Sequence, residues 1–462
     1  MANIDSSNRD GFSSKFGIIA AAAGSAIGLG NIWKFPYIAG ENGGGAFLII
    51  YLIFITLIGI PVMMSEFIIG RKAKQNVFGA FRQLTSHGFW KIIGIMGVLA
   101  AFLILSFYGT VASWTIEYLI LAIKNSFAGK SADEINSMFE IFNTSSLMPV
   151  LLQLVFMGLT AFIVIGGIKK GIEKYTKILM PMLLVIIVYL DITALSLKGG
   201  MDGFRFLFHP DFSKVNTKCI LDALGHSFFT LSLGMGVLIT YASYFQKDTN
   251  LTETSVTVAG ADTLIALLAG IAIFPAVFAF NAEPAGGPGL VFMTLPNIFQ
   301  LMPGGYAFSI LFFLLLAVAA LTSSISILEV VVAYVSEEKN ISRKKATILT
   351  TLLITFTGIL CTLSFGPLKE LTLGGYTIFD IFDKIASNIL LPLGGMLISI
   401  FIGWKLNKHI IIDELTNYGT IKIKFIQLFM FLVRYLAPIA IFFVFVRGIW
   451  EMVEVYFNLL NL

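Results

Sequence analysis

The chain has 462 residues, of which 57% are hydrophobic and 13% are charged, and its formal net charge is +4. This composition excludes an ordinary soluble domain and a disordered chain, and so small a charge does not call for a nucleic-acid partner. The cysteines, Cys219 and Cys361, are too few for a disulfide framework, and the four scattered histidines lack zinc-ligand spacing.

Apolar runs recur along the whole chain, each near the ~20 residues that an α-helix needs to cross a bilayer. They predict an all-α membrane protein with about eleven transmembrane helices and no separate soluble domain. The first run is too long and too interrupted for a cleaved signal peptide. In chain order, the predicted spans are residues 14–38, 45–70, 91–124, 148–167, 174–197, 222–245, 256–280, 306–336, 345–365, 377–404 and 425–448.

Lysine and arginine are distributed unevenly between the predicted loops. If the N-terminus is cytoplasmic, the segments on that side hold 20 of the 31 basic residues, against eight on the other side. This bias agrees with the positive-inside rule. We therefore expect a multi-pass protein of the cell inner (plasma) membrane, with its N-terminus in the cytoplasm and, after an odd number of spans, its C-terminus outside.

The first span contains the segment Gly24-Ser25-Ala26-Ile27-Gly28-Leu29-Gly30-Asn31. Three glycines within seven residues destabilise a helix, and hydrocarbon offers no partners to the backbone groups that a break exposes. Such a break is tolerated where the bare backbone lines a cavity or binds a ligand. The segment therefore predicts a binding site for a cation and a small polar solute.

The sixth span is interrupted in a similar way at Ser232-Leu233-Gly234-Met235-Gly236. Glycine breaks at matching positions five helices apart indicate two five-helix repeats of opposite topology, with a binding site between them. Loose glycine packing between neighbouring helices is the alternative explanation. The expected bounds within one transporter domain, 1–462, are 14–197 and 222–404 for the repeats and 425–448 for an extra helix.

Several long motifs resemble the neurotransmitter:sodium symporter family, most closely its bacterial branch of leucine, tyrosine and hydrophobic amino-acid transporters. They are GSAIGLGNIWKFPYIAGENGGGAF at 24–47, PVMMSEFIIGR at 61–71, SFFTLSLGMGVLITYASY at 227–244, GPGLVFMTLP at 287–296 and LTSSISI at 321–327. The resemblance implies a 5+5 inverted-repeat core, in which helices 1 and 6 are unwound, and sodium-coupled alternating access. Members often have twelve helices, so the end of this chain departs from the pattern.

The resemblance also implies two sodium sites, built from the oxygen ligands that a hard cation prefers. The ligands of the first site would be Ala26, Asn31, Thr230 and Asp262, and the substrate carboxylate would complete it. The ligands of the second site would be Gly24, Ile27, Ala319, Thr322 and Ser323. From the residues alone, Thr322 and Ser323 would be interhelical hydrogen bonders, the usual role of hydroxyls in membranes.

Asp262 is a departure from the family, which usually has asparagine at this position. Acids within membrane spans are rare and usually functional. Many relatives bind chloride near the first sodium, and some bacterial ones have a fixed acid at the position of Ala266 instead; another chloride-site position, usually glutamine, is His226. We hypothesise that Asp262 supplies both a sodium ligand and the compensating charge, so that transport requires no chloride. The alternative is an acid paired with a basic side chain, although no lysine or arginine lies near it in sequence.

The substrate expected from the resemblance is an amino acid. Its carboxylate would meet the freed amides of Leu29 and Gly30 and the hydroxyl of Tyr108, aided by the positive end of a half-helix. Its ammonium would meet carbonyls at Ala26, Phe229, Thr230 and Ser232. Amine carriers of the family have aspartate where Gly28 stands, so this substrate is expected to bring its own carboxylate.

The pocket wall is expected to favour a large hydrophobic side chain. The matching positions are Ile104, Val111, Phe229, Met235, Ser323 and Ile327. Because Met235 is flexible and makes favourable contacts with aromatic rings, tyrosine, tryptophan or phenylalanine is preferred, followed by leucine-like substrates. Met235 could equally be packing filler.

Gates are expected on both sides of the site. Lys34, where the family usually has arginine, would pair with Asp383 or alternatively Asp380, above an aromatic lid of Phe229 and Tyr108. The residues that match the cytoplasmic gate are Arg9, Phe12, Ser243, Tyr244 and Glu337. Arg9 and Glu337 could equally be solvated loop charges. Glu66, another intramembrane acid, is expected to support the breaks by binding freed backbone amides.

These features predict a sodium-coupled symporter that imports an amino acid, with the bilayer and the solute as its partners. A sodium-dependent amino-acid sensor of the same fold is the alternative, because binding without transport would need the same site. An enzyme is not expected, because the intramembrane acids lack histidine or serine partners at known spacing. The sequence leaves open a monomer or a homodimer.

Overall fold

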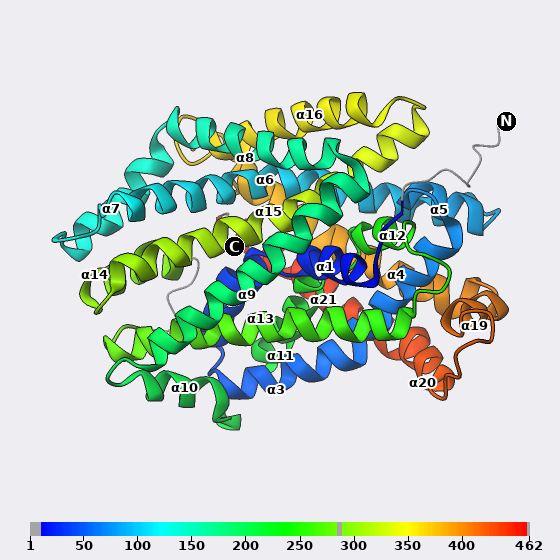
Figure 1. Ribbon diagram of the computed structural model, residues 1–462, viewed down its shortest axis with the longest axis horizontal. Helices are drawn as coiled ribbons and strands as arrows, with labels where there is room; N and C mark the ends of the chain where they lie inside the picture. The colour runs from blue at the N-terminus through cyan, green and yellow to red at the C-terminus, as the bar shows by residue number, and fades with distance from the viewer. Residues whose placement is uncertain (1–10, 284–288, 460–462) are drawn as a thin grey trace.

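The computed structural model describes residues 11–283 and 289–459, and helices dominate this part of the chain. The long helices run side by side along the longest axis of the molecule (Figure 1). The elements of the first half are α1 (Lys15–Ala26), η2 (Gly30–Lys34), α2 (Phe35–Glu41), α3 (Gly45–Phe54), η3 (Ile55–Gly59), α4 (Ile60–Ala73), α5 (Val77–Leu84), η4 (Gly88–Trp90), α6 (Lys91–Ile123), α7 (Ala132–Thr144), α8 (Met148–Ile165), η5 (Ile168–Glu173), α9 (Lys174–Leu195), α10 (Gly200–Phe208) and η6 (Phe212–Lys214).

The second half continues the same all-helical pattern. Its elements are α11 (Thr217–Thr230), α12 (Val237–Ala242), α13 (Leu251–Ala279), η7 (Leu290–Thr294), α14 (Leu295–Leu301), α15 (Gly305–Glu338), α16 (Arg343–Leu363), α17 (Ile378–Lys384), η8 (Ile385–Leu390), α18 (Leu391–Ile400), η9 (Phe401–Lys405), α19 (Lys408–Leu415), α20 (Ile426–Phe431), η10 (Leu432–Leu436) and α21 (Ala437–Leu459). The all-α membrane prediction is therefore confirmed.

Within the described residues, nine helices are long and apolar enough to cross a membrane, and the bent pair α1 and η2–α2 makes a tenth span. Each coincides with one of the predicted runs. The remaining predicted run, 222–245, falls on α11 and α12, which a break divides into pieces of 14 and six residues. Among the described residues, two of the predicted spans are therefore interrupted helices and the others are continuous.

The first interruption follows Ala26. Ser14 caps the start of α1 by accepting a hydrogen bond from the Gly17 amide, and the helix ends where Ile27 adopts an extended conformation. Helical structure resumes at Gly30, and the two pieces are bent by 48°. The predicted break in the first span is thus present at the predicted glycines.

The second interruption lies between Thr230 and Val237. Gly234 and Gly236 have φ values of 81° and 76°, in the left-handed region that glycine tolerates best. A Cβ atom on Gly234 would lie 2.4 Å from the carbonyl oxygen of Leu391 in α18. A larger residue therefore fits neither the turn nor the packing against α18.

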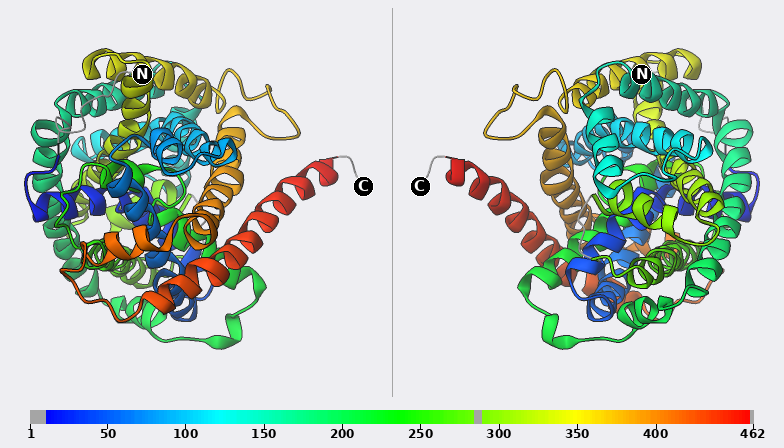
Figure 2. Two further views of the ribbon diagram at one scale, coloured as in Figure 1. Left: turned by 90° about the vertical axis from the view of Figure 1, so that its right-hand side faces the viewer. Right: turned by 90° about the vertical axis from the view of Figure 1, so that its left-hand side faces the viewer.

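An ion pair joins the last helix to the wall of the bundle, and a second one lies within that helix. Arg447 in α21 pairs with Asp222 in α11 at 2.8 Å and with Glu451 at 2.7 Å. Beyond this contact, the C-terminal part of α21 projects sideways from the other helices (Figure 2).

Another ion pair joins the ends of α4 and α19, where the buried side chains of Arg71 and Glu414 pair at 2.6 Å.

Candidate functional site

The two helix breaks face each other across one cavity. Ser232, in the second break, donates a hydrogen bond from Oγ to the carbonyl of Ser25 at the end of α1, at 3.1 Å. Helices α6 and α15, which pack along each other, form the other walls. The residues that line the cavity are Ser25, Ala26, Gly28, Leu29, Gly30, Ile104, Tyr108, Phe229, Thr230, Ser232, Met235, Ser323 and Ile327.

This lining contains every residue predicted to contact a substrate except Val111. Val111 is buried in α6, but it is not among the residues that line the cavity, and Ile104 and Tyr108 form the wall from that helix. Ser25 is a lining residue that the sequence interpretation did not include. The two breaks therefore bring the predicted residues together, whereas their roles in binding a substrate stay predictions.

The backbone freed by the first break contacts Tyr108. The Leu29 amide donates to the Tyr108 hydroxyl at 3.2 Å, so a phenol and a bare helix end meet at the cavity wall. A Cβ atom on Gly28 would lie 2.3 Å from Ser323 Oγ and 3.2 Å from the Tyr108 hydroxyl. The cavity has no space for a side chain at position 28.

Asp262 lies at the centre of an oxygen-rich cluster beside the cavity. Its carboxylate accepts hydrogen bonds from Asn31 Nδ2 at 2.8 Å, Thr230 Oγ1 at 3.0 Å and the Tyr51 hydroxyl at 3.4 Å. Asn31 Oδ1 in turn accepts from the Gly28 amide at 3.0 Å. The hydrogen-bond partners of the fully buried Asp262 side chain are thus neutral groups from three elements, in a set of oxygens that suits a hard cation.

The residues of the predicted second sodium site also lie together. Thr322 Oγ1 donates to the Ala319 carbonyl at 3.0 Å and lies 3.5 Å from the Ile27 carbonyl. Ser323 Oγ lies 3.3 Å from the same Ile27 oxygen. A Cβ atom on Gly24 would be 3.5 Å from Thr322 Cβ, so α1 and α15 approach closely here. These oxygens could surround a second hard cation.

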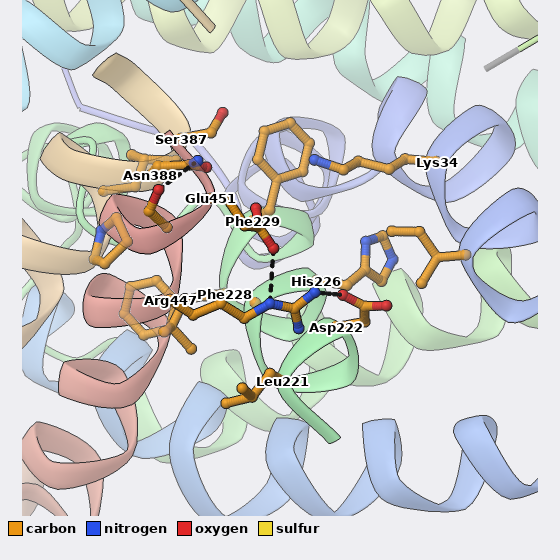
Figure 3. Close-up of a pocket in the computed structure, with 16 residues that line it drawn as sticks. Lys34, Leu221, Asp222, His226, Phe228, Phe229, Ser387, Asn388, Arg447 and Glu451 are labelled. Atoms are coloured by element: carbon orange, nitrogen blue, oxygen red, sulfur yellow. Dashed lines mark hydrogen bonds and ion pairs between the residues drawn. The ribbon is translucent and has the colours of Figure 1, made fainter. Parts of the chain in front are cut away.

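The outer side of the cavity is bounded by Phe229 and Lys34. The Lys34 amine lies 4.2 Å from the centre of the Phe229 ring, and Figure 3 shows it directed at that ring. None of the ion pairs among the described residues includes Lys34, so the predicted pair with Asp383 or Asp380 is not formed in this structure. Asp383 instead accepts from Ser387 Oγ at 2.8 Å, and Asp380 caps its own helix through Thr377.

The predicted cytoplasmic gate residues lie below the cavity. Phe12 is buried against the rings of Tyr241, Tyr244 and Phe245, and its amide donates to the Tyr244 carbonyl at 3.3 Å. Ser243 is buried beside Tyr244 and donates to the Thr240 carbonyl. The Glu337 carboxylate accepts two hydrogen bonds from Asn76, at the start of α5. Arg9 lies outside the described residues.

Glu66 contacts the second break, as expected of a supporting residue. Its Oε1 accepts a hydrogen bond from the Gly234 amide at 2.8 Å, and the side chain is fully buried. A carboxylate from α4 thus satisfies a backbone donor that the broken helix leaves free.

A family model described as the Sodium:neurotransmitter symporter family matches residues 9–145 and 135–460. The chain belongs to this family. The "Uncharacterized sodium-dependent transporter YhdH" of Bacillus subtilis (strain 168) is 40% identical over 436 residues, which cover 94% of this chain and 97% of that protein. An "Uncharacterized sodium-dependent transporter" of Haemophilus influenzae is 36% identical, with 96% and 98% of the two chains covered.

A solved structure shows the same fold. The crystal structure of MhsT in complex with L-phenylalanine is 48% identical, with a TM-score of 0.87, and the match covers 95% of this chain and all of that one. The chain is therefore a multi-pass membrane protein of the inverted-repeat fold. Two broken helices around one cavity are also a typical arrangement of the binding site in secondary transporters.

The structure also reveals an ion pair between the buried Glu329 and the partly buried Arg343, which the sequence interpretation missed. Glu329 in α15 accepts a hydrogen bond from the Tyr244 hydroxyl at 2.7 Å and from Arg343 Nη1 at 2.9 Å. Arg343 also donates to the Val164 carbonyl at the end of α8. The sequence does contain a signal for this residue, since Glu329 is an acid inside a predicted span, like Asp262 and Glu66.

Proposed function

We propose that this protein is a sodium-coupled symporter that imports an amino acid by alternating access. The observation that carries the proposal is the single cavity between two broken helices, with an oxygen cluster on either side of the first break. Freed amides suit a carboxylate, and freed carbonyls and hydroxyls suit a cation and an ammonium group. A solute and an ion bound at adjacent positions can be coupled because each stabilises the site of the other.

An amino acid with a hydrophobic or aromatic side chain is the proposed substrate. The absence of space at Gly28 excludes the aspartate that amine carriers use, so the carboxylate must come from the solute. Ile104, Met235 and Ile327 give the remaining wall an apolar character, which supports a tyrosine-, tryptophan-, phenylalanine- or leucine-like side chain. The phenylalanine named in the MhsT complex is consistent with this class.

Two sodium ions are proposed to bind as co-substrates. The ligands of the first would be Ala26, Asn31, Thr230 and Asp262, and those of the second Gly24, Ile27, Ala319, Thr322 and Ser323. The negative charge of Asp262, which has neutral partners, would balance the first ion without chloride. His226, at one of the family's chloride positions, is buried against the rings of Phe35 and Tyr51 and is not needed as an anion ligand in this scheme.

The proposed setting is the cell inner membrane, with the N-terminus in the cytoplasm and the C-terminus outside. The excess of lysine and arginine in the corresponding loops supports this orientation.

The test is a panel of the twenty labelled amino acids with the purified protein in liposomes. We expect a sodium gradient to drive accumulation of a few hydrophobic or aromatic amino acids, equally with chloride or gluconate as the anion. Sodium-dependent binding without accumulation would indicate a sensor rather than a carrier. Accumulation that ignores sodium across the whole panel would contradict the proposed mechanism.

A further inference from the structure

A groove rich in lysine lies where η5 leads into α9, at the end of the bundle at which α1 begins. Its volume is about 560 Å³, and four lysines line it, Lys169, Lys170, Lys174 and Lys177. The acid in the described part of its wall is Glu173, which is also the only acid in the sequence of residues 141–190. The groove therefore carries an excess of positive charge.

Glu173 balances only one of these lysines, because its carboxylate is fully engaged. Its Oε1 lies 2.6 Å from Lys177 Nζ and accepts hydrogen bonds from the hydroxyls of Ser13 and Ser14, at 2.6 and 3.1 Å. Its Oε2 accepts from the Ser13 amide at 2.8 Å. The acid thus pairs with one lysine and holds the start of α1.

The other three lysines, Lys169, Lys170 and Lys174, form no ion pair with any of the residues 11–283 and 289–459. All three are exposed, and the Lys174 amine lies 5.8 Å from the centre of the Tyr175 ring. Like charges that share one groove repel each other. An anionic group bound between them would remove this repulsion.

The surface that continues from these lysines along the helices is apolar. Ile178, in the wall of the groove, is 57% exposed, and Phe162 on α8 is 65% exposed beside the Tyr175 ring, with 6.4 Å between the ring centres. Only 33% of the apolar window of η5 and α9 is buried within the protein, so most of this span is left to face lipid. An occupant with a phosphate and acyl chains would use both surfaces, whereas free phosphate would use the lysines alone.

We propose that this groove binds the phosphate headgroup of an anionic phospholipid. Lys169, Lys170 and Lys174 are its cationic ligands, and the acyl chains lie against Ile178 and Phe162. Basic clusters at the ends of membrane helices attract anionic lipids in this way. The inference goes beyond the proposed function and does not depend on the transported solute.

The experiment titrates the purified full-length protein in detergent with phosphatidylglycerol or with phosphatidylcholine of the same acyl chains, and native mass spectrometry counts the lipids retained. The wild type is expected to bind phosphatidylglycerol about tenfold more tightly, because each lysine near an anionic headgroup contributes severalfold. The triple variant Lys169→Gln/Lys170→Gln/Lys174→Gln should lose this preference, and Lys174→Gln alone should lose part of it. Excess inorganic phosphate should leave the lipid bound.

The matched control is Lys405→Gln/Lys422→Gln/Lys424→Gln, which removes the same charge from exposed lysines on the same side in the proposed topology. It should keep the preference, and all variants should unfold at the wild-type midpoint because the substituted side chains are exposed. Equal binding of the two lipids by the wild type, a preference that survives in the groove variant, an equal loss in the control, or displacement by inorganic phosphate would overturn the inference. Failure of the proposed function would appear differently, as a protein that keeps the lipid preference but accumulates no amino acid in a sodium gradient.

Discussion

At the first break, the space around the backbone and the burial of charge limit which residues the site tolerates. Gly28 must lack a side chain because Ser323 and Tyr108 occupy the adjacent space. Asp262 must be accompanied by hydrogen-bond donors or a cation because an isolated charge is costly in a buried position. These positions were recognisable in the sequence, since glycines and acids are conspicuous within apolar runs. The contact between the Ser25 and Ser326 hydroxyls was not, because serine is common in membrane helices and the two residues are 301 positions apart in the sequence.

Gly28→Ala is expected to weaken sodium-dependent amino-acid binding by about tenfold, since overpacking typically costs about 1–3 kcal/mol. The new methyl group would displace Ser323 Oγ from the Ile27 carbonyl and crowd the Tyr108 hydroxyl. Equilibrium binding of a labelled amino acid measures the effect. Gly260→Ala is the control, because a Cβ atom there meets nothing within 4 Å. Equal affinities in the two variants would refute the packing argument.

Asp262→Asn is expected to make transport depend on chloride. Without the carboxylate, uptake in gluconate medium should fall by about tenfold, equivalent to about 1.4 kcal/mol, and chloride should restore part of it. The wild type should transport equally in both media. The measurement is sodium-driven uptake into liposomes with either anion, and unaltered uptake by the variant without chloride would count against a charge-balancing role.

At the scale of elements, the helices and their breaks were predictable, whereas several contacts between them were not. Apolar runs and glycine spacing depend on local chemistry, so each predicted span coincides with a helix or a broken pair. The predicted pair of Lys34 and Asp383 is not formed in this structure, where the flexible lysine lies over the Phe229 ring, and a gating role for the two residues stays a prediction. The short helix α19 lies within no predicted span, and its position depends on the buried pair of Arg71 and Glu414.

Arg71→Ala is expected to destabilise the fold by about 3 kcal/mol, because it leaves the buried Glu414 carboxylate with only the longer ion pair to Lys72, at 4.0 Å, and the Tyr418 hydroxyl. The arginine also donates to Asn417 at 3.0 Å, so the loop that follows α19 should loosen as well. The thermal unfolding midpoint in detergent measures the loss. Arg82→Ala removes a more exposed pair with Glu338 and should lower the midpoint much less. Equal unfolding midpoints for Arg71→Ala and Arg82→Ala would contradict the argument that the buried pair contributes more to stability than the exposed pair.

For the whole molecule, the proposed orientation in the membrane rests on the lysine and arginine distribution alone, and it can be tested directly. Lys169 and Lys369 are both exposed, and the proposed topology places them on opposite sides of the membrane. The natural cysteines are buried, so single cysteines at these positions can be labelled selectively.

In intact cells, a membrane-impermeant maleimide is expected to label Lys369→Cys and to leave Lys169→Cys unlabelled. After permeabilisation, both variants should react to a similar extent. Labelling of Lys169→Cys in intact cells would reverse the topology, and with it the direction assigned to the two gates.

The ion pair between Arg447 and Asp222 has a practical consequence for protein engineering. A reporter or fusion partner that replaces α21 would remove the Arg447 guanidinium from Asp222. It would thereby remove an ion pair from α11, the helix that leads into the second break. A fusion attached after Leu459 would leave that pair intact. Among C-terminally truncated variants, those that keep Arg447 should therefore still bind substrate. Those that end before Arg447 should lose binding, even though every cavity-lining residue is still present.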